Sequence, residues 1–346
     1  MQEVFVLQAN GMPFEFPATP QSKYRENAEK YVALYFEYGK FMSRLLNFVI
    51  AMGFAVSGGH VQAAITVTDD MGNQVTLVKP AQRIISLSPH VTEMIYVAGA
   101  GDRIIGTVKY SDYPAAAKNI PRVGDNRQLD IERILAMKPD LLIVWMHGAY
   151  ERQLEMLHNS GIPYFFSEPH KLDNVAETLL KFGSLFGTEK QAQAAAAEFR
   201  QQVQQLNSQY QNKSKVKVFY QVWGKPLYTL NDSHIVSDAI RTCGGENIFG
   251  KLATTAPVVG LEAVLQENPE VIITGDSKNQ AVSGIEQWKT FPTLLATKNN
   301  NLISIEGDLV NRSGPRIIEG AKLICQALEQ ARQKRDKTVA SPQGKK

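Results

Sequence analysis

The chain contains 346 residues, of which 44% are hydrophobic, 21% charged and 9% aromatic, and its formal net charge is +3. This composition is typical of folded globular proteins and excludes a largely disordered or fibrous chain. Residues 332–346 hold six basic groups and one acidic group, while residues 1–63 hold five of each, so the remaining chain is slightly acidic. It therefore lacks the basic surface that nucleic-acid binding requires. We expect residues 332–346 to form a basic, disordered tail.

A cleavable secretory signal is predicted at residues 42–63. Arg44 precedes a mostly apolar stretch of 12 residues, 45–56, and small residues follow at Val61 and Ala63, where signal peptidase needs them. The stretch is too short for a membrane span, which takes roughly 20 apolar residues. We expect a mature chain from about Ala64 in the periplasm; the alternative is a buried helix.

Residues 1–41 have no export character, although signal peptides stand at the extreme N-terminus. Our hypothesis is that translation begins at Met42 and that residues 1–41 are a non-native upstream extension.

No cysteine lies near the cleavage site, which indicates a protein without a lipid anchor. The two cysteines, Cys243 and Cys325, predict a disulfide in an exported chain; the alternative is two buried thiols.

The mature region alternates strand and helix patterns, which is typical of parallel sheets covered on both faces. Helical propensity is strongest in the Ala- and Gln-rich stretch at 188–212, where Phe199, Val203, Leu206 and Tyr210 recur on one helical face. We expect one helix there, roughly 35 Å long. The other predicted elements, in chain order, are a hairpin at 65–78, a strand at 83–87, a helix at 92–98, a strand at 104–108, a helix at 131–137, strands at 140–145 and 162–167 around a helix at 151–158, a strand at 215–222, a helix at 237–242, a helix at 288–295, a strand at 301–305 and a helix at 316–332.

An internal repeat divides this region into two similar halves. Residues 130–145, DIERILAMKPDLLIVW, match residues 260–275, GLEAVLQENPEVIITG, as a helix, a proline-marked break and a buried strand. The sequence therefore predicts two Rossmann-like α/β lobes with mainly parallel sheets, at 64–187 and 213–331, joined by the single helix at 188–212. A stiff helical connector limits how far such lobes close.

No catalytic or metal motif is recognisable in the sequence. There is no nucleophile elbow and no dinucleotide fingerprint, and the histidines lack paired metal spacing. His90 and Glu93 are three apart on a predicted helix, where they could hold one side of a metal ion. We interpret both instead as exposed polar residues. Asp308 and Arg312 are interpreted as an ion pair. We therefore expect no enzyme and no metal site.

Four short motifs nevertheless resemble one known family. They are LSP at 87–89, YSDYP at 110–114, CGGENIF at 243–249 and SGPRI at 313–317. In this order and spacing the chain is similar to the helical-backbone periplasmic substrate-binding proteins of ABC importers, over residues 83–330. YSDYP, CGGENIF and the cysteine pair resemble most closely the members that carry vitamin B12 (cobalamin).

The resemblance implies a ligand cleft between the lobes, at the carboxyl ends of the strands. It implies that aromatic side chains cover the flat corrin and that a few polar groups fix its orientation. Two tryptophans of the cobalamin carriers fall here at Asn126 and Ala256, and Trp223 compensates in our interpretation. The ligand-binding residues implied by the resemblance are Ser88, Pro89, Tyr110, Trp145, Trp223, Asp308 and Arg312.

The resemblance also implies a partner. Family members present one acidic residue per lobe to arginines of a dimeric inner-membrane permease, and the matching residues are Glu132 and Glu262, which are equivalent in the two repeats. We expect a monomeric binding protein that needs no cofactor and carries the corrinoid as its ligand. The alternatives are a carrier of haem or a ferric siderophore, and a periplasmic enzyme on the same scaffold.

Overall fold

The computed structural model describes residues 4–9, 12–17, 30, 34, 37–42, 64–145, 151–276 and 284–340. The chain forms two compact units, Met1–Gln62 and Ala63–Lys346. In the first unit, β1 (Val4–Ala9) and β2 (Met12–Pro17) pair as an antiparallel hairpin. Apart from Met42, the predicted signal at 42–63 lies outside the described residues, as does most of the predicted upstream extension, residues 1–41.

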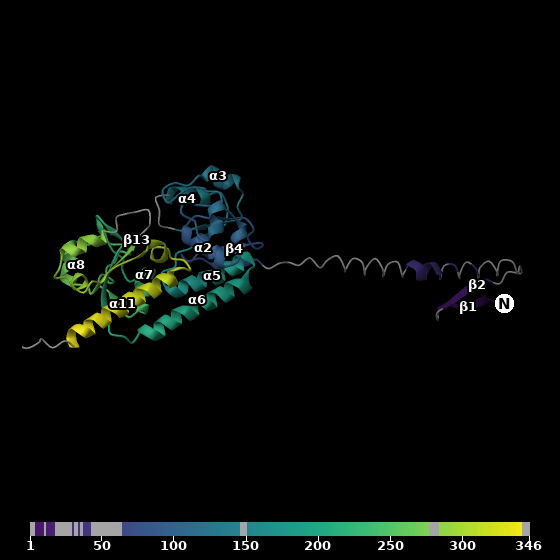
Figure 1. Ribbon diagram of the computed structural model, residues 1–346. Helices are drawn as coiled ribbons and strands as arrows, with labels where there is room; N and C mark the ends of the chain where they lie inside the picture. The colour runs from purple at the N-terminus through teal and green to yellow at the C-terminus, as the bar shows by residue number, and fades with distance from the viewer. Residues whose placement is uncertain are drawn as a thin grey trace, which may run out of the picture. The chain divides into compact units, whose positions relative to one another are not determined.

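The first lobe of the second unit, where Figure 1 labels α2, α3 and α4, contains a four-stranded parallel sheet in the order β6-β5-β7-β8. An antiparallel hairpin precedes it, as predicted. The bounds of the elements are β3 (Ile65–Thr68), β4 (Gln74–Leu77), β5 (Ile84–Ser86), α2 (Pro89–Val97), η1 (Gly101–Arg103), β6 (Ile104–Thr107), η2 (Ala115–Asn119), α3 (Ile131–Ala136), β7 (Leu141–Val144), α4 (Glu151–His158) and β8 (Tyr164–Phe166).

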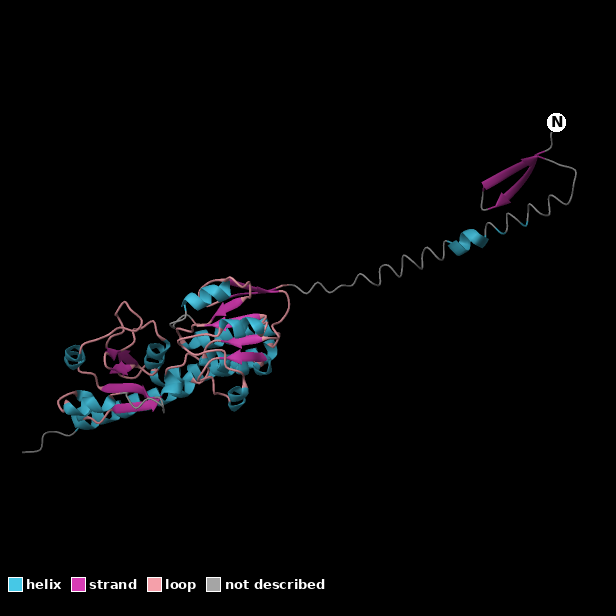
Figure 2. Ribbon diagram, turned by 90° about the horizontal axis from the view of Figure 1, so that it is seen from above, coloured by secondary structure: helices cyan, strands magenta, loops and turns pink. Residues whose placement is uncertain are grey.

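The second lobe contains another four-stranded parallel sheet, in the order β12-β9-β13-β14. Helices flank the strands in both lobes (Figure 2). The bounds of the elements are β9 (Val216–Gln221), β10 (Trp223–Gly224), β11 (Leu227–Tyr228), α7 (Ile235–Thr242), β12 (Gly245–Asn247), α8 (Leu261–Glu267), β13 (Val271–Asp276), η3 (Ile285–Thr290), α9 (Leu295–Lys298), β14 (Leu302–Glu306), α10 (Gly307–Val310) and α11 (Ile317–Ala340).

The two lobes repeat one topology, which confirms the predicted internal repeat. In each sheet the second strand in sequence lies on one side of the first, and the third and fourth lie on the other. The correspondence extends to side chains, because Asp140 accepts hydrogen bonds from the backbone N–H groups of Gln82 and Arg83, at 2.8 and 2.9 Å, in front of β5. Glu270, its predicted counterpart, accepts one from the N–H of Lys217 at 3.0 Å. Each acidic residue thus ties the start of its strand to the neighbouring strand.

A long helix connects the lobes, as predicted. This helix, α6 (Glu189–Tyr210), has 22 residues and buries the predicted face, including Phe199, Leu206 and Tyr210. A second helix, α5 (Leu172–Phe186), packs along it, and α6 also lies beside α11, as Figure 1 shows. Helix α5 was not predicted from the sequence; it packs against the connecting helix from the side of the first lobe, since it also contacts β3 and α2.

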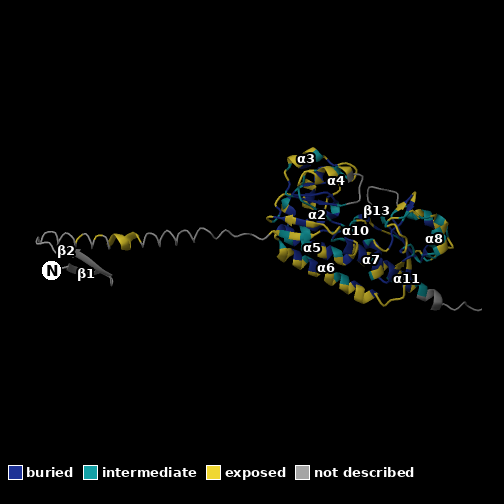
Figure 3. Ribbon diagram, turned by 180° about the vertical axis from the view of Figure 1, so that it is seen from behind, coloured by how far each residue is buried: buried dark blue, intermediate teal, exposed yellow. Residues whose placement is uncertain are grey.

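Burial follows the sheets and the inner faces of these helices. Figure 3 shows buried residues in the strands and exposed residues along the outer side of α6. Strand β7 is buried at every position, as expected for a strand covered on both faces. No helix among the described residues combines the length and apolarity of a membrane span.

The second lobe is closed by its last helix. The predicted disulfide is present between Cys243, at the end of α7, and Cys325 of α11, and both residues are fully buried. Arg332 donates hydrogen bonds to the carbonyl oxygens of Ser214, Cys243 and Gly244 and is only 4% exposed. The prediction that a disordered tail begins at residue 332 is therefore wrong at its start, because the buried carbonyl groups hold this guanidinium and α11 continues to Ala340.

We predict that the disulfide contributes substantially to the stability of this lobe. It closes a separation of 82 residues, for which loop entropy gives about 4–5 kcal/mol as an upper value. The double variant Cys243→Ala/Cys325→Ala should unfold at a lower urea concentration than the oxidised wild type. Dithiothreitol should shift the wild type toward the variant and leave the variant unchanged; equal midpoints for wild type and variant would contradict the prediction.

Candidate functional site

The predicted ligand-binding residues of the first lobe follow the carboxyl ends of three adjacent parallel strands. Ser88 and Pro89 come after β5, Tyr110 after β6 and Trp145 after β7. Since the carboxyl ends of parallel strands meet at one edge of a sheet, the topology brings these residues to the same edge. Pro89 is the first residue of α2, a position that suits its fixed φ and missing N–H.

The predicted residues of the second lobe occupy the same edge of their own sheet. Trp223 stands two residues after β9, and Asp308 lies in α10, directly after β14. Arg312 follows α10 and forms an ion pair with Asp308, with Nη2 and Oδ1 2.9 Å apart. The predicted Asp308–Arg312 ion pair is therefore present.

Exposed aromatic side chains occur in these same loops. Within residues 64–340, the described large aromatic side chains classed as exposed are Tyr110, Tyr113 and Trp223, at 51%, 46% and 38%. Tyr110 also has a φ of 69°, a left-handed conformation that is uncommon outside glycine. Exposed aromatic surface and backbone strain both concentrate at binding sites.

A buried histidine lies beneath this edge. The Nδ1 atom of His90 is 2.7 Å from the hydroxyl oxygen of Ser88, and its ring meets Trp145 edge to face at a centroid distance of 6.0 Å. Ser88 itself is only 3% exposed, so its hydroxyl is already used inside the lobe. Burial lowers the pKa of His90 to about 4, the backbone of Ser167 partly offsets this effect, and the charge of Arg312 adds to it. His90 is therefore neutral at pH 7.

We predict that His90 makes folding sensitive to mild acid. The pKa of His90 is about 4 in the folded protein and about 6.5 in the unfolded chain. Between pH 6.5 and pH 4, His90 therefore binds a proton in the unfolded chain but not in the folded protein. Stability should then fall by roughly 3 kcal/mol from pH 6.5 down to pH 4 through this residue. The free energy of unfolding in urea should decrease less over that pH range for His90→Gln than for the wild type. The same pH dependence in both proteins would contradict the prediction.

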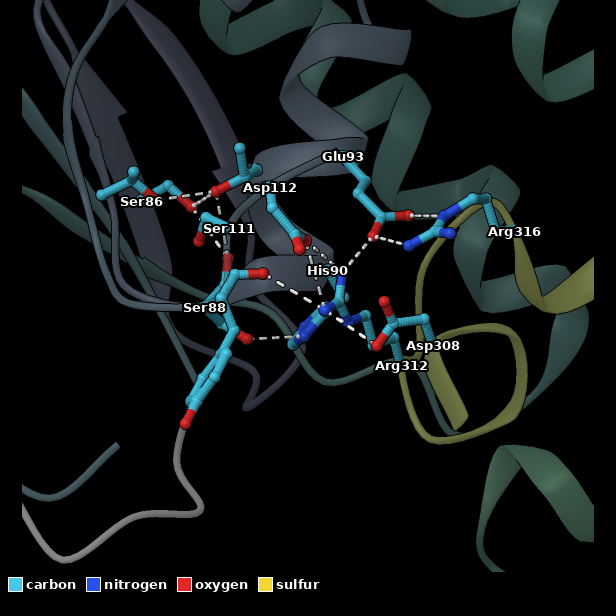
Figure 4. Close-up of polar contacts among 12 residues, drawn as sticks. Ser86, Ser88, His90, Glu93, Ser111, Asp112, Asp308, Arg312 and Arg316 are labelled. Carbon is cyan, nitrogen blue, oxygen red and sulfur yellow. Dashed lines mark hydrogen bonds and ion pairs between the residues drawn. The ribbon is translucent and has the colours of Figure 1, made fainter. Parts of the chain in front are cut away.

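Glu93 is the centre of a buried ionic cluster. The prediction that His90 and Glu93 are exposed polar residues is therefore wrong. The side chain of Glu93 is 2% exposed, because the second lobe covers α2 at this point. Its Oε1 accepts from Nη1 of Arg312 at 2.9 Å and from Nη2 of Arg316 at 2.7 Å, and its Oε2 accepts from Nε of Arg316 at 2.8 Å (Figure 4). The hydrogen bonds that Arg316 donates to Glu93 raise the pKa of Arg316, so the guanidinium stays charged.

Arg312 joins this cluster to the strained loop after β6. Its Nη2 atom donates to the carbonyl oxygen of Tyr110 at 3.2 Å, and its Nη1 atom lies 3.4 Å from a carboxylate oxygen of Asp112. The guanidinium of Arg316 also lies over the ring of Tyr113, 4.1 Å from its centroid. Arg312 was predicted through the family resemblance, whereas the ionic role of Glu93 and that of Arg316 were not, although Arg316 stands in the SGPRI motif that carried the resemblance.

The predicted docking residues occupy equivalent positions. Glu132 is the second residue of α3 and Glu262 the second residue of α8, and both are exposed. A surface hollow of about 900 Å³ lies beside Glu132, and its lining includes the exposed apolar side chains of Leu135 and Met156. An acidic group in the first turn also stabilises its own helix.

Asn126 and Ala256, the two positions that the family resemblance matches to tryptophans, are exposed. Among the described residues, no three His, Cys, Asp or Glu side chains are grouped so as to hold a metal ion.

Comparison with known proteins identifies the class to which this fold and site belong. A family model described as periplasmic binding protein matches residues 84–309. The chain therefore belongs to the periplasmic binding protein family. The vitamin B12-binding proteins of Vibrio campbellii and Vibrio cholerae are 37% and 36% identical to it, over 74% and 72% of this chain and 92% and 90% of those relatives.

Solved structures give the same result. The crystal structure of the periplasmic vitamin B12-binding protein BtuF of Vibrio cholerae has 35% sequence identity and a TM-score of 0.66, covering 73% of this chain and 98% of that one. The periplasmic haem-binding protein RhuT from Roseiflexus has 21% identity and a TM-score of 0.63, which shows a shared fold alone.

Proposed function

We propose that this protein is a monomeric periplasmic carrier that binds vitamin B12 or a related corrinoid between its lobes and delivers it to an inner-membrane ABC permease. The observation that carries the proposal is the placement of exposed Tyr110, Tyr113 and Trp223 in the loops that follow β6 and β9. A corrin ring is a wide, largely apolar disc, and aromatic faces bury such a surface efficiently. The vitamin B12-binding relatives, at up to 37% identity, support the same ligand class.

The polar residues of the proposed site supply orientation. Asp308 and Arg312 offer charged groups from the second lobe. Ser88, Pro89 and Trp145 would form the wall of the first lobe, because the Ser88 hydroxyl already pairs with His90. The amide groups on the rim of a corrinoid are neutral hydrogen-bonding partners for such side chains. Binding of this kind needs no cofactor and leaves the ligand chemically unchanged.

We predict that the purified protein binds cyanocobalamin with 1:1 stoichiometry in isothermal titration calorimetry. Tyr110→Ala, Trp145→Ala and Trp223→Ala should each weaken binding by about 1 kcal/mol or more, because each removes aromatic contact area. Met71→Ala, at an exposed position in the turn between β3 and β4, is the control and should bind normally. Millimolar or absent cyanocobalamin binding, with tight binding of haem or a ferric siderophore, would assign the protein to the alternative ligand class.

Delivery is proposed to use Glu132 and Glu262. These exposed carboxylates stand at equivalent places in two lobes of the same topology, which suits two arginine-bearing subunits of a dimeric permease. Leu135 and Met156 provide apolar surface beside Glu132. The proposed export signal at 42–63 would place the protein in the compartment that faces such a permease.

We predict that Glu132→Ala/Glu262→Ala binds cyanocobalamin like the wild type but fails to support its uptake in cells that depend on this carrier. The reason is that both side chains are exposed, so the fold tolerates their loss. The matched control is Glu155→Ala/Glu246→Ala, which also removes one exposed glutamate from each lobe. Normal uptake with the first variant, or equal loss with both, would contradict the docking role.

A further inference from the structure

We propose that Glu93 fixes the angle between the two lobes and thereby positions Arg312, without contacting the ligand itself. Glu93 stands on α2 of the first lobe, whereas Arg312 and Arg316 belong to the segment between α10 and α11 of the second. All three hydrogen bonds of the Glu93 carboxylate therefore cross from one lobe to the other.

The cluster leaves almost no surface of Glu93 open to a ligand. Both carboxylate oxygens accept from guanidinium groups at 2.7 to 2.9 Å, and the side chain is 2% exposed. The two arginines are 13% and 14% exposed, so they are also largely removed from water. A carboxylate this deeply buried is stable only when it is paired, which ties its position to that of both arginines.

The backbones of the two lobes also meet closely at this point. A methyl group added at Gly314 would lie 3.2 Å from the Cβ atom of His90, so only glycine allows this approach without displacement. Arg316 adds contact with the ring of Tyr113, and Arg312 adds contact with the carbonyl of Tyr110. The residues that bring the lobes together are thus interleaved with the exposed aromatic side chains of the proposed ligand site.

A second interlobe contact lies on the side of the connecting helices. The carboxylate of Asp238, on α7, accepts a hydrogen bond at 2.9 Å from the backbone N–H of Leu172, the first residue of α5. A helix N-terminus and a carboxylate attract one another, so this contact fixes α5 against the second lobe. With one contact at the helical connection and another at Glu93, the two lobes retain little freedom to rotate.

The energetics of buried ion pairs indicate a role in geometry more than in stability. Opening the lobes would break the bonds of Glu93 but would rehydrate all three charged groups, and these two effects largely cancel. Directional, bidentate pairing of the kind made by Arg316 nevertheless defines one arrangement. Loss of Glu93 should therefore broaden the range of lobe separations more than it lowers the stability of either lobe.

The experiment measures that range directly. Spin labels attached at Ala136→Cys on α3 and Gln266→Cys on α8 report the lobe separation by pulsed electron paramagnetic resonance. Both positions are exposed and the native cysteines are paired, so only the introduced cysteines take the label. In the ligand-free protein, Glu93→Gln should give a broader or longer distance distribution than the wild type. Asp112→Asn is the matched control, since it removes a half-exposed carboxylate from the same Arg312 and should leave the distribution unchanged.

Ligand affinity tests the positioning of Arg312, and this part rests on the proposed function. Glu93→Gln should weaken cyanocobalamin binding about tenfold, and Asp112→Asn should not. Tighter binding by Glu93→Gln would mean that the cluster competes with the ligand for Arg312, which would overturn the positioning role. If the wild type binds no corrinoid, the proposed function fails, while the distance measurement still decides whether Glu93 sets the lobe angle.

A second variant guards against a simple folding defect. Arg316→Gln removes the partner with two bonds to Glu93 and should broaden the distances in the same way. The double variant Glu93→Gln/Arg316→Gln leaves fewer unpaired charges, so it should recover stability but keep the broad distribution. Unchanged distances in all three variants would overturn the inference.

Discussion

Parallel strand pairing is the constraint on which this structure depends. Parallel strands require a crossover after each strand, so every strand ends at the same edge of its sheet, and the loops that leave that edge are free to carry function. Here the loops after β5, β6 and β7 hold Ser88, Tyr110 and Trp145, and those after β9 and β14 hold Trp223 and Asp308. One rule of chain geometry, applied twice, thus gathers residues that are far apart in the sequence.

Local patterns in the sequence were sufficient to predict the fold. The repeat at 130–145 and 260–275 predicted two lobes of one topology, and the equivalent hydrogen bonds of Asp140 and Glu270 show that the match reaches individual side chains. Helix α5 was predictable as well, because Leu172, Val175, Leu179, Phe182 and Phe186 recur at helical spacing and are all buried. It was missed because the Ala-rich composition of α6 gave the stronger signal.

The parts that escaped prediction depend on contacts between the lobes. Glu93 has the sequence pattern of an ordinary exposed helical residue, and its burial arises only because Arg312 and Arg316 approach it from more than 200 residues away in the chain. Arg332 escaped prediction for a similar reason: it lies in a run of charged residues, and only the folded second lobe presents the carbonyl groups that receive it. A charged residue is therefore predicted to be exposed to solvent unless its distant partner in the fold is known.

Helix α11 completes the second lobe although it follows every strand of that lobe in the sequence. The strands of the first lobe and α5 are complete by Phe186, so that lobe can assemble while the rest of the polypeptide is still emerging. The second lobe cannot, since Cys325 and Arg332 both return from α11 to the end of α7. The core that α11 shares with β9, β13 and β14 therefore needs this helix in place, and the interlobe contacts of Arg316 come from the residue directly before it.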